Sequence, residues 1–112
     1  MKIAIVDSRS LTTCEIEKYV QKGDEIISGG AVGIDRCAAE YATRNSIKLT
    51  ELIPNYAKYG KAAPIIRNKN IVDMADKLII FWDGESKGTS SVIKYAKSIG
   101  KEHVIVICKK NE

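Results

Sequence analysis

The sequence contains little of several residue types, and each shortage excludes a class of protein. Its 112 residues include one His, one Trp, one Phe and two Pro. The three cysteines, Cys14, Cys37 and Cys108, form no CxxC pair and have no spacing typical of metal ligands, so neither a disulfide scaffold nor a zinc site is indicated. No Ser/His/Asp or Cys/His set is recognisable, so the catalytic residues, if any, stay unknown.

Long apolar runs are also missing. A membrane helix needs about 20 apolar residues, and the N-terminal stretch, residues 1–6, is too short for a signal peptide. We therefore expect a cytoplasmic protein with no membrane segment, where free thiols stay reduced. The length predicts one domain, residues 1–112. A net charge of +4 permits binding to phosphates or nucleic acid without requiring it.

What the sequence does contain is a regular alternation of strand and helix patterns. Short apolar or β-branched runs predict five strands, at residues 2–6, 25–28, 48–53, 77–82 and 103–108. One-sided apolar periodicity predicts four helices, at residues 11–22, 33–46, 64–75 and 88–99. In the third helix Ile66, Ile71 and Met74 are expected to face inward, and residues 55–63 before it are expected to form a loop. The alternation indicates an α/β, three-layer Rossmann-like domain with a five-stranded parallel sheet, order 3-2-1-4-5, and helices on both faces.

Unusual residues gather at one edge of the predicted sheet. In open α/β sheets, ligands bind outside the carboxyl ends of the strands. The segments that follow these ends are rich in glycine, hydroxyl and arginine residues, whereas the opposite edge has plain turns. This asymmetry between the two edges predicts a binding site at the carboxyl edge.

Two loops at that edge, residues 29–33 and residues 84–89, each lead into a helix N-terminus. Helix N-termini attract anions, and glycine lets the backbone approach a phosphate closely. Further donors at this edge are Arg9, Arg67, Ser86, Thr89 and Ser90. Each loop alone is equally typical of a tight turn, and neither has the spacing of a dinucleotide-binding or P-loop fingerprint. Together with the two arginines they favour a phosphate-bearing ligand.

Four stretches carry a family resemblance: residues 5–9, residues 27–35, residues 59–63 with Arg67 and Asn68, and residues 86–89. They resemble the SLOG superfamily of Rossmann-like domains, which includes the DprA (Smf) and LOG phosphoribohydrolase groups, and most of all its small YspA-like branch. The resemblance implies a nucleotide pocket. Its phosphate-binding residues would be Ser28, Gly29, Gly30, Gly33, Ser86, Gly88 and Thr89. Its polar wall would be Ser8, Arg9, Arg67 and Asn68.

Three departures from the family pattern limit what carries over. Asp7 stands where the family has Gly, and its carboxylate could repel a phosphate, recruit Mg²⁺ with a nucleotide, or cap the next helix. Val92 stands where LOG enzymes have a working glutamate. DprA proteins have additional domains that this chain lacks. The resemblance therefore implies the ligand class, while neither named activity transfers directly.

Some candidate residues have two readings. Asp35, in the first turn of its helix, either favours the helix dipole or orients a ribose or an arginine. Tyr56 and Tyr59, with Lys58 and Lys61, could stack nucleobases along a single strand, but a lid or a dimer contact is as typical of such a loop. A homodimer is compatible with the sequence, which singles out no helix face for it.

Three functions stay open. The first is a sensor or carrier module for a nucleotide-derived ligand, with no turnover. The second is a LOG-like hydrolase that cleaves the N-glycosidic bond of a nucleoside monophosphate, an activity that Val92 argues against. The third is DprA-like binding of single-stranded DNA. We also expect Arg67→Ala to lose ligand affinity while leaving the fold intact.

Overall fold

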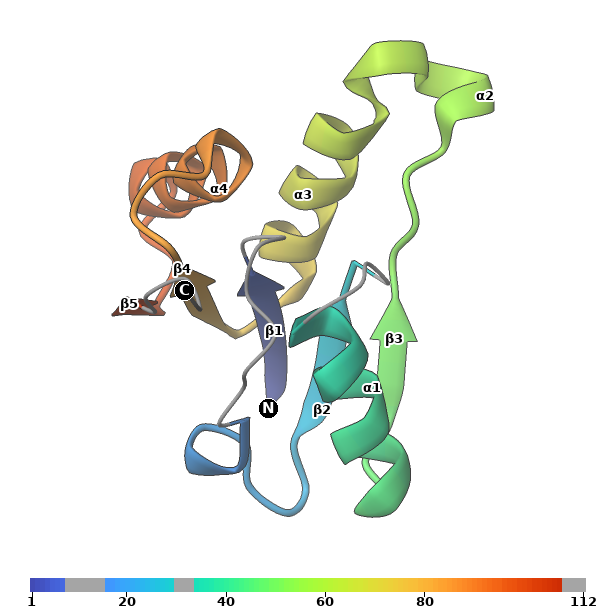
Figure 1. Ribbon diagram of the computed structural model, residues 1–112, viewed down its shortest axis with the longest axis vertical. Coiled ribbons are helices and arrows are strands. Elements are labelled where there is room, and N and C mark those ends of the chain that lie inside the picture. The colour runs from blue at the N-terminus through green and yellow to red at the C-terminus, as the bar shows by residue number, and fades with distance from the viewer. Residues whose placement is uncertain (8–15, 30–33, 108–112) are drawn as a thin grey trace.

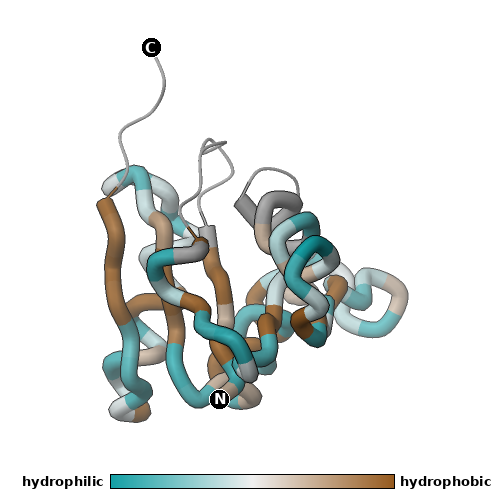
Figure 2. Tube along the Cα trace, turned by 90° about the horizontal axis from the view of Figure 1, so that it is seen from below, coloured by the Kyte–Doolittle hydropathy of each residue, from teal (hydrophilic) through white to brown (hydrophobic). Residues whose placement is uncertain are grey.

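The computed structural model describes residues 1–7, 16–29 and 34–107. Its sheet has five parallel strands in the order β3-β2-β1-β4-β5 (Figure 1), which confirms the predicted Rossmann-like topology. The strands are β1 (Lys2–Asp7), β2 (Glu25–Ser28), β3 (Leu49–Glu51), β4 (Lys77–Trp82) and β5 (His103–Ile107). Hydrophobic residues follow one another along β5, the strand that precedes the C-terminus (Figure 2), as is typical of a parallel sheet covered on both faces.

Helices cover both faces of the sheet. They are α1 (Ile34–Arg44), α2 (Tyr56–Tyr59), α3 (Ala63–Met74) and α4 (Lys87–Ser98), with two 3-10 turns, η1 (Ile16–Lys18) and η2 (Gly60–Ala62). Because successive strand side chains point to opposite faces, Ile3 and Ile5 belong to one core cluster and Ala4 to the other. No helix in the described parts of the chain is long and apolar enough to cross a membrane.

The two core clusters show which helices lie on which face. The first cluster packs η1 and α1 against the sheet and contains Ile3, Ile5, Ile16, Val20, Ile26, Ala38, Ala42, Ile79 and Phe81. The second packs α3 and α4 against the other face and contains Ala4, Ile27, Ile71, Val72, Ala75, Leu78, Ile80, Val92, Ile93 and Ala96. The predicted three-layer arrangement is thereby confirmed.

The helix predicted over residues 11–22 is wrong in its described part, residues 16–22. The chain there makes the single 3-10 turn η1 and then turns into β2. Asp24 ends the helical path, because its Oδ2 accepts the N–H of Gln21 at 2.9 Å and its own N–H donates to the Gln21 carbonyl at 3.1 Å. Residues 11–15 lie outside the described residues.

Residues 55–63, predicted as a loop, contain α2 and η2. Asn55 starts α2, since its Oδ1 accepts the N–H of Lys58 at 3.1 Å. Gly60 ends that helix with a φ of +56°, which favours glycine. Pro64 stands in the first turn of α3, as its fixed φ predicts.

The predicted inward face of α3 is wrong at Met74, and Ile66 is half-buried without belonging to the core. Ile71 is buried, as expected, and Val72 and Ala75 are buried beside it. These three residues define the stripe that packs against the sheet. Met74 lies to one side of that stripe and is 41% exposed, because each residue advances about 100° around the helix.

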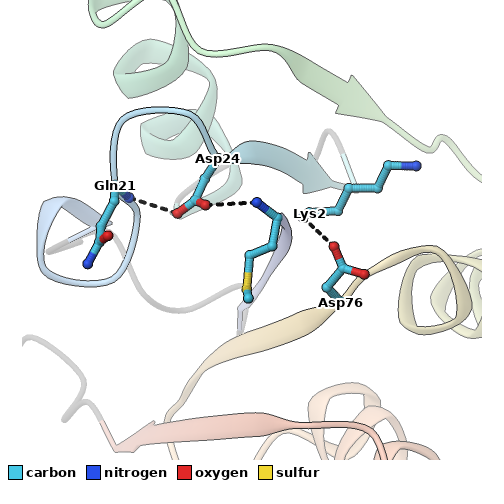
Figure 3. Close-up of polar contacts among 5 residues, drawn as sticks. Lys2, Gln21, Asp24 and Asp76 are labelled. Atoms are coloured by element: carbon cyan, nitrogen blue, oxygen red, sulfur yellow. Dashed lines mark hydrogen bonds and ion pairs between the residues drawn. The ribbon is translucent and has the colours of Figure 1, made fainter.

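Two carboxylates bind the first residues of the chain at the amino edge of the sheet (Figure 3). Asp24 pairs through Oδ1 with the amino terminus of Met1 at 3.1 Å, and Asp76 Oδ2 accepts the N–H of Lys2 at 2.7 Å. The bond from the Gln21 N–H lowers the pKa of the Asp24 carboxyl, burial opposes this, and the bond from the amino terminus lowers it further. These contacts attach the start of β1 to the residue before β2 on one side and to the residue before β4 on the other.

Candidate functional site

The strand order places a topological switch point between β1 and β4. The connection after β1 leads to β2 on one side of it, whereas α4 leads from β4 to β5 on the other side. The carboxyl ends of the two strands are neighbours, since Asp7, the last residue of β1, is in register with Phe81, the next-to-last residue of β4. In open α/β sheets, ligands bind where consecutive connections diverge in this way. The loops after β1 and β4 are therefore the first candidates for a site.

The loop between β4 and α4, residues 83–86, is held by its own side chains. Asp83 Oδ1 accepts the N–H groups of Glu85 at 2.9 Å and of Ser86 at 2.8 Å. The indole N–H of Trp82 donates to the Ser86 carbonyl at 3.2 Å. Gly84 has a φ of +83°, which favours glycine at the turn. The backbone at the start of α4 is thus pre-organised.

The first turn of α4 is suited to an anion. Its first helical hydrogen bond runs from the Ser90 N–H to the Ser86 carbonyl at 3.1 Å, so helix geometry leaves the N–H groups of Lys87 and Gly88 without an acceptor inside the helix. This turn contains no acidic residue. Gly88 is exposed, and a Cβ built on it meets no atom within 4 Å. Within the part of the chain that the structure describes, neither packing nor an unusual φ accounts for glycine at this position.

Arg67 ties the ends of two strands to α3. Its Nη1 donates to the Gly29 carbonyl at 3.0 Å and to the Leu52 carbonyl at 3.5 Å, and its Nε donates to Asn68 Oδ1 at 2.7 Å. The Leu52 N–H in turn donates to the carbonyl of the buried Ser28 at 2.8 Å. Arg67 therefore has a structural role that the sequence prediction did not include.

The structure brings the predicted site residues together in two groups. Ser28, Gly29, Arg67 and Asn68 meet where β2 ends. Ser86, Gly88 and Thr89 start α4, where the Thr89 side chain is buried. Ser8, Arg9, Gly30 and Gly33 lie outside the described residues. Asp35 belongs to the first turn of α1, and its side chain is not among those described.

Sequence reasoning missed two contacts at this edge. The first is that of Asp83, which fixes the loop before α4. An Asp followed by Gly is a known signal for such a turn, so this role could have been found. The bond between Arg67 and the Gly29 carbonyl left no local signal, because the two residues are 38 positions apart.

A metal centre receives no support from the described side chains. Within residues 1–7, 16–29 and 34–107, no three His, Cys, Asp or Glu side chains are grouped so that they could hold an ion. Asp7 and Asp35, two of the acidic residues expected at the carboxyl edge, are not among the described side chains. The hypothesis that Mg²⁺ accompanies a nucleotide at Asp7 therefore stays a prediction.

Comparison with known proteins adds no relative. No protein-family model matches the sequence, and no curated protein or solved structure matches it. The resemblance to the SLOG superfamily is thus a hypothesis that depends on the residues quoted for it. The geometry of the carboxyl edge carries the functional argument.

Proposed function

We propose that the protein binds a nucleotide or a nucleotide-derived phosphate ligand at the carboxyl edge of the sheet, as a sensor or carrier module. The observation that carries this proposal is the start of α4, where the N–H groups of Lys87 and Gly88 have no acceptor inside the helix and a Cβ built on Gly88 meets no atom of the described residues within 4 Å. The helix dipole favours a phosphate at such a position. The Lys87 side chain adds a positive charge to the same turn.

The position of this turn supports a ligand larger than free phosphate. It follows β4, which flanks the switch point, where α/β sheets bind nucleotides and similar ligands. A phosphate at α4 would leave the rest of the ligand along the carboxyl edge, toward the ends of β1 and β2. The ends of β2 and β3 are tied together there by Arg67. A pre-organised edge of this kind lowers the entropic cost of binding.

Binding without turnover is favoured over hydrolysis by the state of Asp83. This carboxylate comes directly before the start of α4 and accepts two backbone N–H bonds. A general base must take a proton in the reaction, and protonation would weaken both bonds and disturb the loop. Val92, which stands where LOG enzymes have a glutamate, is buried in the core. Both observations argue against a LOG-like mechanism at this turn.

The test is a thermal-shift screen of the full chain against nucleoside mono-, di- and triphosphates, ADP-ribose and dinucleotides, with and without Mg²⁺. A ligand at about 100 times its Kd stabilises a protein by about 2.7 kcal/mol, or roughly 10 °C for a chain of this size. We expect at least one phosphate-bearing compound to produce such a shift, and its unphosphorylated nucleoside to produce none. A folded sample that responds to no compound would contradict the proposal.

A second step separates the sensor from the hydrolase. The compound that stabilises the protein is incubated with it, and the products are separated by chromatography. Recovery of the intact compound supports a sensor or carrier. Release of a free base and ribose 5-phosphate would replace it with the hydrolase.

A further inference from the structure

Residues 53–66 form a helical arm that leaves the sheet at the end of β3. The arm comprises α2, η2 and the first turn of α3, and Figure 1 shows α2 beyond the carboxyl end of β3, away from the strands. No residue of α2 or η2 is buried, and Ala63 is the one buried residue of the arm. The arm therefore adds little to the core, so the stability of the fold does not explain which side chains the arm exposes.

The surface of the arm is apolar and aromatic. Ile53 is 71% exposed, Tyr56 and Ile65 are each 58% exposed, and Tyr59 is 39% exposed. These are four of the eight large hydrophobic side chains exposed in the described residues. Exposed hydrophobic residues that are scattered singly need no explanation, whereas a group on one segment marks an interaction surface.

The charge of the arm, together with that of the α3 residues that follow it, defines the partner. Residues 52–72 contain four basic residues and no acidic residue, so their formal charge of +4 equals that of the whole chain. The remaining residues contain 14 basic and 14 acidic side chains and are neutral. Lys58, Lys61 and Lys69 are exposed, while Arg67 is half-buried against strand carbonyls. A basic surface that carries aromatic rings complements a polyanion.

We infer that the helical arm binds single-stranded nucleic acid, with bases stacked on Tyr56 and Tyr59 and phosphates paired with the neighbouring lysines. The two tyrosines are three residues apart and are neighbours on the helix surface. The Lys58 Nζ lies 5.1 Å from the centre of the Tyr59 ring, so a cation and a stacking surface are side by side. A single strand likewise presents bases and phosphates side by side, so that both can be bound at once.

Other occupants fit the arm less well. A second copy of the chain docked arm to arm would bring two arms together that each carry a charge of +2, from Lys58 and Lys61, and like charges in contact are unfavourable. A duplex offers no unpaired base faces for the tyrosines to stack on. The inference does not depend on the proposed function, because none of these tyrosines or lysines belongs to the residues proposed to bind the nucleotide.

The first experiment measures the stacking. A fluorescein-labelled oligodeoxythymidine of about 12 nucleotides is titrated with the full chain and followed by anisotropy. Saturable binding is expected, and the double variant Tyr56→Leu, Tyr59→Leu should weaken it by roughly 5- to 150-fold per ring, as stacking of a base on an aromatic side chain predicts. The matched control Tyr56→Phe, Tyr59→Phe keeps both rings and should bind like the wild type.

The second experiment measures the pairing of lysines with phosphates. Each phosphate neutralised on a single strand contributes about 0.7 to the slope of log K against log salt. We expect Lys58→Gln with Lys61→Gln to reduce that slope by about 0.7 for each phosphate that the variant leaves without a lysine partner. The matched control, Lys94→Gln with Lys97→Gln, removes the same charge from exposed positions on α4 and should leave the slope unchanged.

Three results would overturn the inference. The wild type could fail to bind the oligonucleotide, the leucine variant could bind as well as the phenylalanine variant, or the α4 control could lose as much salt dependence as the arm variant. A free protein that is dimeric by light scattering, and that Ile65→Ser makes monomeric, would assign the arm to a second copy. The arm variants should keep the nucleotide-induced thermal shift, so the arm and the proposed edge site succeed or fail separately.

Discussion

The two edges of the sheet differ in whether the partial charges of the helix ends are already stabilised by charged groups of the protein itself. Helices end at the amino edge and begin at the carboxyl edge, because every connection in a parallel sheet runs back in the same direction. Helix C-termini carry a partial negative charge and N-termini a partial positive one. At the amino edge the chain supplies its own cation, since Lys101 Nζ donates to the Ala75 carbonyl at the end of α3.

At the carboxyl edge, the first turn of α4 contains no acidic side chain that would stabilise the positive end of the helix in the same way. Asp83 holds the loop residues Glu85 and Ser86, while the first turn of the helix itself contains no acidic residue. Asp24 and Asp76 at the amino edge are likewise bound to backbone N–H groups. The comparison teaches that one edge is completed by the fold, whereas the other retains a turn in which an external anion would be stabilised.

The largest expected effect is on that turn. Gly88→Val should abolish the thermal shift caused by the phosphate ligand, a loss of about 2.7 kcal/mol at 100 times the Kd, because the added side chain fills the space beside the N–H groups. The ligand-free melting temperature should change little, since a Cβ at Gly88 meets no atom within 4 Å. Thermal-shift curves with and without ligand measure both.

The control for Gly88→Val is Ser98→Val at the far end of α4, which should keep the full ligand shift. If Gly88→Val also keeps it, the site lies elsewhere on the edge.

The next effect concerns the tie between strands at the carboxyl edge. Arg67→Ala removes bonds to the Gly29 and Leu52 carbonyls and to Asn68, and should lower the free energy of unfolding by about 2 kcal/mol, or roughly 8 °C in melting temperature. This replaces the expectation that the variant leaves the fold unaffected. Arg44→Ala, at an exposed position on α1, is the control and should melt like the wild type. An equally stable Arg67→Ala would show that the tie contributes nothing.

A smaller effect separates Gly84, in the loop before α4, from Gly88, in the first turn of that helix. Gly84 has a φ of +83°, so Gly84→Ala should cost about 1–2 kcal/mol of unfolding free energy. Gly88 has no such φ, and Gly88→Ala should be neutral or slightly stabilising, because alanine favours the helix. Urea unfolding of the two variants under one buffer gives the comparison directly. Similar losses in both would mean that Gly88 also has a structural role.

The smallest effect is at the amino edge. Asp24→Asn should cost about 1 kcal/mol at neutral pH, because hydrogen bonds to a charged carboxylate are lost at a partly exposed site. The folded protein holds the pKa of Asp24 below its ordinary value of 3.8. The stabilisation is therefore present above that value and is lost as the pH falls through the lower folded-state pKa.

Urea unfolding between about pH 7 and pH 2 tests this sign. The difference between wild type and Asp24→Asn should be constant at neutral pH and shrink in acid, while Glu102→Gln, an exposed change at the same edge, should show little difference. A difference that grows in acid would contradict the assignment.

Much of the fold could be predicted from the sequence. The bounds of β2 and β4 and the strand order agree with the patterns of short apolar runs, because a parallel strand buried on both faces must be apolar along its length. The start of α3 near Pro64 follows from the fixed φ of proline. These features depend on local chemistry that each segment carries by itself.

The errors arose where distant residues decide. The helix predicted through residue 22 is ended by Asp24, whose carboxylate also binds the amino terminus 23 positions away. Met74 was expected inward from its periodicity, but the packing of α3 on the sheet selects Val72 and Ala75. The first outcome depends in part, and the second wholly, on contacts with residues far away in the sequence.

The candidate site, like the fold, could be predicted from the sequence only in part. The sequence by itself determined that glycine, hydroxyl and arginine residues collect at the carboxyl edge, because a parallel sheet returns every strand end to one side. Only the tertiary structure decided what those residues do: Arg67 binds the Gly29 carbonyl 38 positions away, Asp83 is engaged by its own loop, and the turn at Gly88 keeps open space. Hydrogen bonds and free volume depend on which atoms meet, and that is settled only when the chain has folded.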